Sequence, residues 1–369
     1  MDTMFIKNVN KHLRNNRPYF PKDKFCEIFK TGDLLEIGFL SRQCKNDMSG
    51  SCLMCDYGRA DKVGTDEIYL GTMDKILSEE CENINFLLLC SNGSILDEYQ
   101  ISTQLLTKIL KKAQNCKIPE IIIETHYKDV TKDRLDLIKS IIQKPVTIEM
   151  GLETINPTYQ NAFFMKGIDI GNYKKTVELI KSYNFNVEVN IMLGLPFLST
   201  FEQVEDVKKT IKWAIQNNCI PVVFPVNIKA HTMLRYLYEN ELYKPISLWL
   251  LVYLLDSLEP TVLEKIIIAW YGNRDESYTP KIPTIHPVCC NECRNNLISF
   301  GRMFLDLEDG LARKELIETL KKTTTCNCYK NLIQELNCSE SNFKTNYNSF
   351  YVQLQRDFSH TISKETKNE

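Results

Sequence analysis

Residues 34–55 read LLEIGFLSRQCKNDMSGSCLMC, an apolar run followed by a loop that carries three cysteines. The run at 34–40 has the length and the branched or aromatic side chains of a buried strand. Gly50 and its small serine neighbours let the backbone fold tightly, so the three thiols can converge on one metal centre. These thiols belong to Cys44, Cys52 and Cys55. We therefore expect a metal-binding loop directly after a strand.

The number of cysteines in this loop bears on the kind of metal centre. Iron-sulfur clusters are usually held by four cysteines, whereas zinc takes four closed ligands, or three plus water. Three cysteines favour a 4Fe-4S cluster in which one iron lacks a protein ligand, so that a small molecule can bind and react there. A zinc knuckle and a set of scattered buried thiols are the alternatives, because free cysteine is common in protein cores.

Further apolar runs, rich in Ile, Val, Leu or Phe, follow at 85–90, 120–124, 146–150, 187–193 and 220–226. Between them lie stretches with helical periodicity, such as 99–112 and 172–183. Continuous apolar strands that alternate with helices are typical of a parallel sheet covered on both faces. Six such units predict an α/β fold, namely a partial (βα)6 barrel of the TIM type. In parallel barrels the chemistry takes place at the carboxyl ends of the strands, where the cysteine loop is expected.

Polar residues and glycines follow these strands at the same predicted rim. The second strand ends in a turn of hydroxyl and amide groups, the third in a carboxylate and His126, and later strands in carboxylates, an amide or a glycine. Each has a plain alternative as a turn residue or a helix charge, but together beside a metal loop they favour a pocket. The candidates are Ser91, Gly93, Ser94, Glu153, Glu188, Asn190, Gly194 and Leu195.

This pattern divides the chain into an amino-terminal extension at 1–30, the barrel at 31–230 and a cysteine-containing, α-rich extension at 231–369. The basic stretch 8–24 is expected to be solvated or to face a substrate, and the polar end at 361–369 to fray.

The carboxyl-terminal extension suggests a second metal site. An apolar helix is expected at 248–258 and a strand at 265–270. Cys290 and Cys293 have the two-residue spacing of half a metal site, which Cys326 and Cys328 can complete. We expect zinc there, with a reduced, partly buried cysteine cluster as the alternative.

Composition is that of an ordinary soluble protein, with 43% hydrophobic and 25% charged residues. The net charge of -2 gives no overall attraction to nucleic acid or to a membrane, so RNA binding would need a partner or a local strip such as Lys108, Lys111 and Lys112. No secretory signal or membrane-spanning stretch is visible, which predicts a cytoplasmic protein. Fourteen cysteines in that reducing compartment are expected to be thiols or metal ligands.

Several spaced motifs carry a resemblance to a known family. They are the cysteine loop, CSNGSILDE at 90–98, IEMGLETINPTYQNAFFMKG at 148–167, VNIMLGLPF at 189–197, and FPVNIKAHTMLRYLYENELYKPISLW at 224–249. In this order, over about 34–293, they resemble the radical S-adenosylmethionine (SAM) enzymes. Within that superfamily they are most similar to the archaeosine-forming radical proteins, relatives of the radical domain of elongator-type tRNA acetyltransferases.

The resemblance implies two cofactors and an electron donor. Cys44, Cys52 and Cys55 would bind three irons of a 4Fe-4S cluster, and the amine and carboxylate of SAM would chelate the fourth. An electron from a low-potential donor such as ferredoxin or flavodoxin would then cleave SAM to methionine and a 5'-deoxyadenosyl radical, which abstracts a substrate hydrogen.

The resemblance also implies roles by position. Gly93 and Ser94 match the segment that meets the SAM amine, and Glu153 and Asn190 the groups that meet its carboxylate or ribose. Gly194 and Leu195 match the backbone near adenine. Met54 stands where an aromatic residue usually precedes the last cysteine, so Tyr57 either takes the adenine contact or packs on the rim.

Three functions follow as hypotheses. The archaeosine-forming proteins cleave a carbon-nitrogen bond of a lysine adduct on a tRNA deazapurine, beside a partner that installs the lysine, so an enzyme of tRNA modification, of the lyase or the transferase type, is implied. A radical SAM maturase of a peptide or a small amine-bearing metabolite is the second, because Lys244-Pro245-Ile246 replaces the paired prolines of that group. The third is a non-catalytic iron-sulfur electron carrier or regulator.

Overall fold

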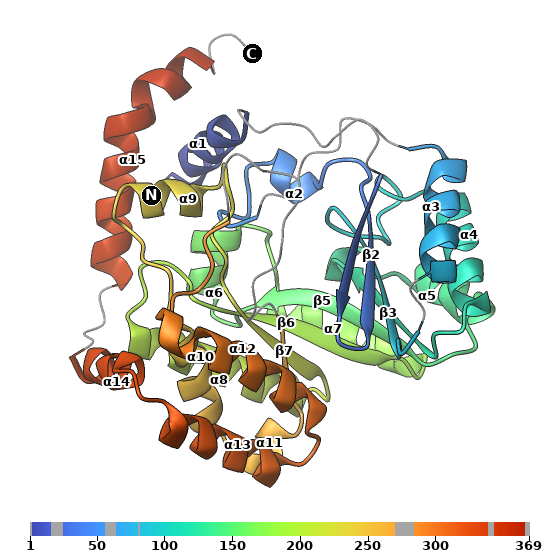
Figure 1. The fold of residues 1–369 in the computed structure, drawn as a ribbon. Helices are drawn as coiled ribbons and strands as arrows, with labels where there is room; N and C mark the ends of the chain where they lie inside the picture. Colours follow the sequence, from blue (N-terminus) through green and yellow to red (C-terminus); the bar gives the residue numbers. More distant parts are fainter. Residues whose placement is uncertain are drawn as a thin grey trace.

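The computed structural model describes residues 2–15, 25–55, 64–79, 82–269, 284–338 and 343–365. Its centre is an eight-stranded sheet whose strands lie side by side in chain order (Figure 1). The strands are β1 (Cys26–Thr31), β2 (Leu34–Phe39), β3 (Phe86–Ser91), β4 (Glu120–Thr125), β5 (Val146–Glu153), β6 (Asn186–Leu193), β7 (Ile220–Pro225) and β8 (Ile267–Ile268). β1 and β2 are antiparallel, and all later neighbours are parallel. The sheet curls into a half-barrel, which confirms the predicted fold class.

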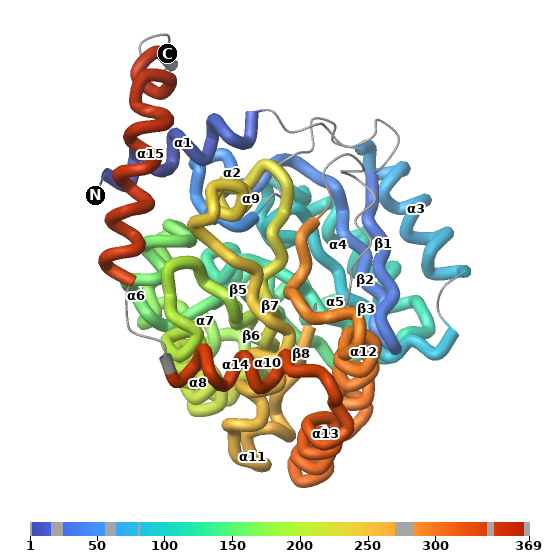
Figure 2. Tube along the Cα trace, turned by 60° about the vertical axis from the view of Figure 1, so that its left-hand side comes forward, coloured from blue at the N-terminus to red at the C-terminus, as the bar shows by residue number. Residues whose placement is uncertain are grey.

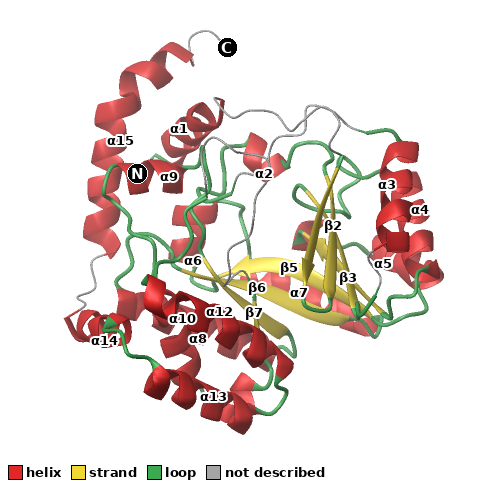
Figure 3. Cartoon of the chain, in the orientation of Figure 1, coloured by secondary structure: helices red, strands yellow, loops and turns green. Residues whose placement is uncertain are grey.

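Helices cover the outer side of this sheet, as the colouring by secondary structure shows (Figure 3). They are α3 (Asp66–Glu79), α4 (Thr103–Asn115), α5 (Lys132–Ile141), α7 (Ile170–Ser182) and α8 (Thr200–Gln216). Along β6, Val187, Val189 and Ile191 belong to one hydrophobic core with residues of α7 and α8. Because successive strand residues point to opposite faces, Glu188 and Asn190 face the concave side.

The six predicted strands correspond to β2 through β7, each within about three residues of its expected bounds. The structure adds β1, which joins β2 through a tight turn at Gly32, where φ is +60°. β1 escaped the periodicity argument because it is an edge strand with much of its surface exposed. Part of the expected strand at 265–270 forms β8, while Trp270 lies outside the described residues. The sheet thus extends beyond 31–230 at both ends.

The carboxyl-terminal region is helical, as expected (Figure 2). It contains α9 (Met233–Glu239), α10 (Leu248–Asp256), α11 (Pro260–Leu263), α12 (Asn291–Asp306), α13 (Gly310–Thr323), α14 (Cys328–Cys338) and α15 (Phe343–Glu365). α10 is the predicted apolar helix. No helix in the described ranges is long and apolar enough to cross a membrane.

The two ends of the chain pack together, with α15 running beside α1 (Thr3–Asn15) in both views (Figures 1 and 2). A second hydrophobic cluster joins Ile6 and Val9 of α1 to Phe350, Leu354 and Ile362 of α15. The expectation of a frayed end from 361 was therefore wrong for the residues through 365. A helix that buries one apolar residue per turn needs few of them, and the surrounding polar letters hid the pattern.

Candidate active site

The cysteine loop leaves the carboxyl end of β2, as predicted, and contains the short helix α2 (Lys45–Met48), with Cys44 just before it. Gly50 has a φ of +77°, and a side chain there would begin 2.2 Å from the carbonyl oxygen of Lys7 in α1. Glycine is therefore required for a steric reason as well as a conformational one. Cys52 is also left-handed, with a φ of +60° and a buried side chain. Strain of this kind recurs at functional sites.

Arg14 of α1 holds the inner side of this loop. Its guanidinium donates to the carbonyl oxygens of Asp47 (3.0 Å), Ser51 (2.9 Å), Cys52 (2.5 Å) and Cys55 (3.1 Å). It also forms an ion pair of 2.8 Å with the Asp47 carboxylate, and both side chains are at most 3% exposed. The part of the basic stretch 8–24 that forms α1 is thus a support for the cysteine loop. Sequence reasoning missed this role because nothing local marks Arg14 as a partner of a loop 30 residues away.

The opposite side of the loop rests on a π-helical turn, η2 (Gln160–Phe164). The amides of Cys52 and Leu53 donate to the carbonyl oxygens of Phe164 (2.8 Å) and Phe163 (2.9 Å). The Ser51 hydroxyl donates to the carbonyl of Met165 (3.1 Å). π-Helical turns are rare in proteins overall, and those that occur frequently lie at functional sites. The loop backbone is therefore fixed from two sides before any ligand is considered.

Lys166 follows that turn and faces the cysteines. Its ammonium lies 3.3 Å from Oε1 of Glu153, a candidate residue that sits at the end of β5 with a φ of +66°. Burial acts to lower the pKa of Lys166, but the charges of Cys52, Glu153, Cys55 and Cys44 outweigh it and raise the pKa above its usual range. Burial raises the pKa of Cys52 to about 11. A permanent positive charge thus stands beside three potential thiolates, as an anionic centre would require.

We expect Lys166→Met to weaken iron retention by about 10- to 100-fold, the usual effect of removing a group that supports metal ligands. Iron release to a chelator under anaerobic conditions measures it. Lys166→Arg should retain most of the iron, because the positive charge is kept. Lys132→Met, at an exposed position of α5, is the control. Equal release rates in all four proteins would contradict the role assigned to Lys166.

Gly93 lies directly against Cys44. A side chain at this position would begin 2.6 Å from the Cys44 sulfur, so only glycine lets the segment after β3 approach the cysteine so closely. Ser91 and Ser94 are used internally, because the Ser91 hydroxyl (2.7 Å) and the Ser94 amide (3.0 Å) both donate to Oε1 of Gln100. Gly93 thus lies beside Cys44, one of the expected cluster ligands, while the two serines hydrogen-bond within the turn around it.

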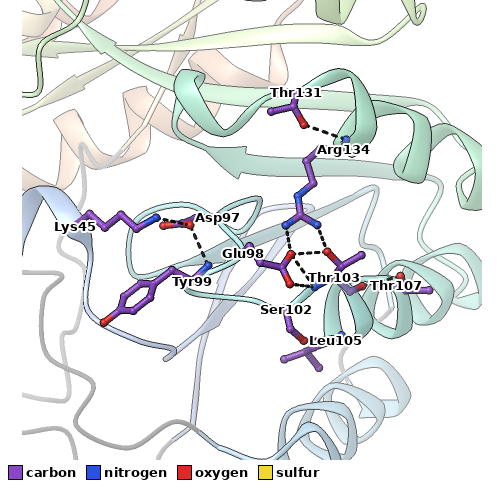
Figure 4. A network of polar contacts seen from close by, with 10 residues as sticks. All are labelled: Lys45, Asp97, Glu98, Tyr99, Ser102, Thr103, Leu105, Thr107, Thr131 and Arg134. Atoms are coloured by element: carbon purple, nitrogen blue, oxygen red, sulfur yellow. Dashed lines mark hydrogen bonds and ion pairs between the residues drawn. The ribbon is translucent and has the colours of Figure 1, made fainter.

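A polar network fixes the same segment (Figure 4). Lys45 of α2 pairs with Asp97 (2.8 Å), which connects the cysteine loop to the segment after β3. Arg134 of α5 pairs with Glu98 and donates to the Thr103 hydroxyl (2.7 Å), and Glu98 accepts from the Thr103 amide (3.0 Å). Lys45 and Glu98 are largely exposed, so these pairs add little stability. Their effect is to hold the cysteine loop, the segment after β3 and helix α5 in one arrangement.

His126 directly follows β4, at the same end of the sheet as the cysteine loop. Its Nδ1 accepts a hydrogen bond from the Lys128 amide (3.3 Å), so the proton belongs on Nε2. This Nε2 is buried and has no hydrogen-bond partner among the described residues. Burial, with Lys166 and Lys128, lowers the pKa of His126 to about 3, so the ring is neutral at pH 7. His126, which the sequence placed after the third predicted strand, is therefore a donor available to a ligand.

The remaining candidates lie in different surroundings. Gly194 has a φ of +114°, and its carbonyl accepts from the Tyr243 hydroxyl (2.8 Å). Leu195 and Met54 are buried in the hydrophobic cluster shared with α1 and α15. Asn190 donates to Glu149 (2.8 Å) on the concave face. Tyr57 lies outside the described residues.

Glu188 lies far from the rim. It is the third residue of β6 and is six positions before Gly194, which corresponds to about 20 Å along an extended strand. Glu188 lies in register with Glu149 of β5, and Glu149 lies in register with Glu124 of β4. The three carboxyl groups form a row across the concave face. Burial raises the pKa of Glu188 to about 8, with Glu149 and Glu120 contributing. The position does not suit contact with a ligand held at the cysteine loop.

This raised pKa makes stability depend on pH. Between about pH 4.5 and about pH 8 the folded state holds a proton on Glu188 that the unfolded chain releases, so stability falls as pH rises. Glu188→Gln removes this loss. At each pH we compare the free energy of unfolding of Glu188→Gln with that of the parent. The advantage of Glu188→Gln should be roughly 1 to 3 kcal/mol larger at pH 8 than at pH 4.5.

Urea unfolding at the two pH values measures this difference. Glu178→Gln, at an exposed position of α7, should show no change between them. A Glu188→Gln effect of the same size at both pH values would contradict the assignment.

The carboxyl-terminal cysteines form the tightest set of potential ligands. The sulfurs of Cys290, Cys293, Cys326 and Cys328 all lie within 4.8 Å of one another. Among the described residues, the three cysteines of the loop after β2 do not form such a group. Sulfurs as close together as those of the carboxyl-terminal group suit a single zinc ion, which each sulfur binds at about 2.3 Å.

Comparison with characterised proteins adds a relationship. The chain is 26% identical over 226 residues to archaeosine synthase subunit beta of Methanosarcina acetivorans, which covers 60% of this chain and 65% of that protein. It is 27% identical over 208 residues to archaeosine synthase subunit beta of Thermococcus kodakarensis, which covers 54% and 63%. The chain is a distant homologue of archaeosine synthase subunit beta. The predicted relationship is thereby confirmed, although the match spans less than two thirds of either relative.

Two further comparisons complete the picture. Among solved structures, archaeal Elp3 of Methanocaldococcus infernus is similar with a TM-score of 0.46 and 15% identity, covering 72% of this chain and 61% of that one. No protein-family model matches the chain.

Proposed function

We propose that the protein is a radical SAM enzyme whose 4Fe-4S cluster is held by Cys44, Cys52 and Cys55. The observation that carries the proposal is the loop itself: three cysteines on a backbone fixed by Arg14 and η2, beside the partly buried side chain of Lys166. With SAM bound, a cluster held by these cysteines would supply one-electron cleavage of the sulfonium and, through it, removal of a substrate hydrogen. Homology to archaeosine synthase subunit beta supports the same conclusion.

The neighbouring residues suit SAM by their chemistry. Gly93 brings backbone against Cys44, where the amine and carboxylate of SAM would meet the cluster. Glu153 has one buried oxygen, Oε2, that lacks a hydrogen-bond partner among the described residues. A carboxylate only accepts hydrogen bonds, so Glu153 is assigned to a ribose hydroxyl rather than to the SAM carboxylate. Neutral His126 is assigned as a donor to SAM or substrate.

We further propose that the reaction is carbon-nitrogen cleavage on a modified 7-deazaguanine of tRNA, beside a partner that attaches lysine. The relatives' names support this substrate. The strip of Lys108, Lys111 and Lys112 gives no support, because Lys108 pairs with Asp66 (2.8 Å) and Lys112 with Asp74 (2.5 Å) of α3. An RNA substrate would therefore depend on the partner for its electrostatic attraction.

One observation favours the second candidate, a small amine-bearing metabolite or a peptide. Glu124 and Glu149 make the concave face acidic, beside Glu188, whose raised pKa of about 8 keeps it protonated near neutral pH. Such a face attracts a cationic amine and repels phosphate. A lysine adduct on tRNA and a free amine would both satisfy it, so the two candidates share the amine and differ in what carries it.

Anaerobic turnover separates the candidates. The reconstituted protein is incubated with dithionite, SAM and one substrate at a time: tRNA bearing the lysine adduct, a lysine-containing peptide, or a free amine. The substrate that raises 5'-deoxyadenosine formation, and passes deuterium into it, is the one used. An intact cluster that yields no 5'-deoxyadenosine under any condition would identify an electron carrier or regulator instead.

A further inference from the structure

Four cysteines from two separate helices meet in the carboxyl-terminal region. Cys290 precedes α12, Cys293 lies in its first turn, and Cys326 and Cys328 stand at the start of α14. The two pairs are separated by the 32 residues between Cys293 and Cys326, which include helix α13. The four sulfurs nevertheless lie within 4.8 Å of one another, and those of Cys290 and Cys293 are 3.5 Å apart. The fold therefore brings together two half-sites that the sequence keeps far apart.

The spacing of the sulfurs indicates what they can bind. Four sulfurs at about 2.3 Å from a tetrahedral zinc ion lie about 3.8 Å from each other. A disulfide would require about 2.05 Å, and all four thiols are free. Ligands of an iron-sulfur cluster bind different irons and so lie farther apart than ligands of one ion. A single soft ion with tetrahedral preference fits best.

Trp249 provides an independent observation. This first-turn residue of α10 is fully buried, and its indole Nε1 has no partner that meets hydrogen-bond geometry among the described residues. The indole lies beside the sulfur of Cys293 and acts against the rise in the pKa of that thiol that burial causes. Thiolates that bind a metal commonly accept hydrogen bonds from outside the ligand set, which orient and stabilise them. A thiolate that binds a metal here would be the acceptor for this buried donor.

We propose that Cys290, Cys293, Cys326 and Cys328 bind one zinc ion in a closed, structural site that is separate from the cysteine loop after β2. Four sulfur ligands leave no open position, so the ion has no catalytic part. It connects the start of α12 to the start of α14 and holds both against Trp249 of α10. Tyr329, next to Cys328, packs on the Trp249 ring at 5.2 Å and continues that contact. The ion thus joins α12 and α14 beside α10 within the carboxyl-terminal region.

X-ray absorption at the zinc edge of the unaltered, full-length protein tests the ligand set. We expect about one zinc per chain and a shell of four sulfurs at about 2.3 Å. Because this measurement needs no variant, it is informative even if the variants fold poorly. A shell that contains nitrogen or oxygen, or the absence of zinc, overturns the proposal, as do disulfides between these cysteines in mass spectrometry of alkylated protein.

Variants test the location. Cys290→Ser combined with Cys326→Ser should lose essentially all zinc and keep its iron. Cys289→Ser should keep both, because Cys289 is adjacent in sequence but outside the group of four. Zinc retained by the double variant, or iron lost from it in place of zinc, overturns the proposal. Loss of iron on Cys52→Ala with zinc retained distinguishes this site from the proposed active site.

Discussion

Replacing Cys52 by alanine is expected to abolish 5'-deoxyadenosine formation, down to the level of a control without protein. The side chain is buried and its backbone is fixed by hydrogen bonds to Phe164 and Arg14, so no neighbouring group can take its place. Two remaining cysteines cannot hold a cluster that normally needs three or four. Anaerobic reconstitution followed by chromatography of the nucleoside products measures the effect, and iron content measured on the same sample shows whether the cluster is lost.

Cys219→Ala is the matched control for this substitution. Cys219 is also a buried free cysteine, but it lies just before β7, at the opposite end of the strands from the cysteine loop. Both variants remove one buried sulfur and leave a similar small cavity. Iron and 5'-deoxyadenosine should therefore fall only for Cys52→Ala. If the two variants lose activity equally, or if Cys52→Ala keeps it, the loop is not the cluster site.

Replacing Arg14 by methionine is expected to lower the free energy of unfolding by about 3 to 5 kcal/mol, the usual result of breaking a fully buried ion pair by removing one partner. The Asp47 carboxylate would remain buried without its cation, and the carbonyl groups of Ser51, Cys52 and Cys55 would lose their donor. Iron retention should also fall, because these carbonyls belong to the cysteine loop. Urea unfolding and iron analysis measure the two effects.

Lys11→Met is the control for Arg14→Met, because Lys11 is exposed on the same helix. Its effect should stay within about 0.5 kcal/mol, as for most surface substitutions. Combining Arg14→Met with Asp47→Asn should recover part of the lost stability, since the unpaired buried charge is then removed. A Arg14→Met variant as stable as the Lys11→Met variant would mean that α1 does not support the loop.

The sequence predicted the barrel well because its signals are local. Strands β2 through β7 are continuous apolar runs separated by amphipathic helices, and this alternation requires only neighbouring residues. The cysteine loop was recognisable for the same reason, since three cysteines and Gly50 lie within twelve residues. Homology to archaeosine synthase subunit beta was visible from short motifs in order.

The roles of other residues could not be predicted from the sequence, because they depend on contacts with distant parts of the chain. Arg14 looked like one more charge in a basic stretch, and only the packing of α1 brings it to the loop. Nothing in the sequence distinguishes Lys166 from the other lysines, because its position near the cysteines depends on the turn at η2. In the reverse direction, Glu188 was a reasonable candidate by composition, yet the register of β6 puts it near the wrong end of the strand.

By itself the sequence determined the half-barrel, the cysteine loop at its rim and the four cysteines of the carboxyl-terminal region, because hydrophobic period and cysteine spacing act over a few residues. The tertiary structure alone decided that Arg14 and η2 hold the loop and that Lys166 lies beside it. These are contacts between segments far apart in the chain. Their geometry follows from how the helices pack and carries no local signature.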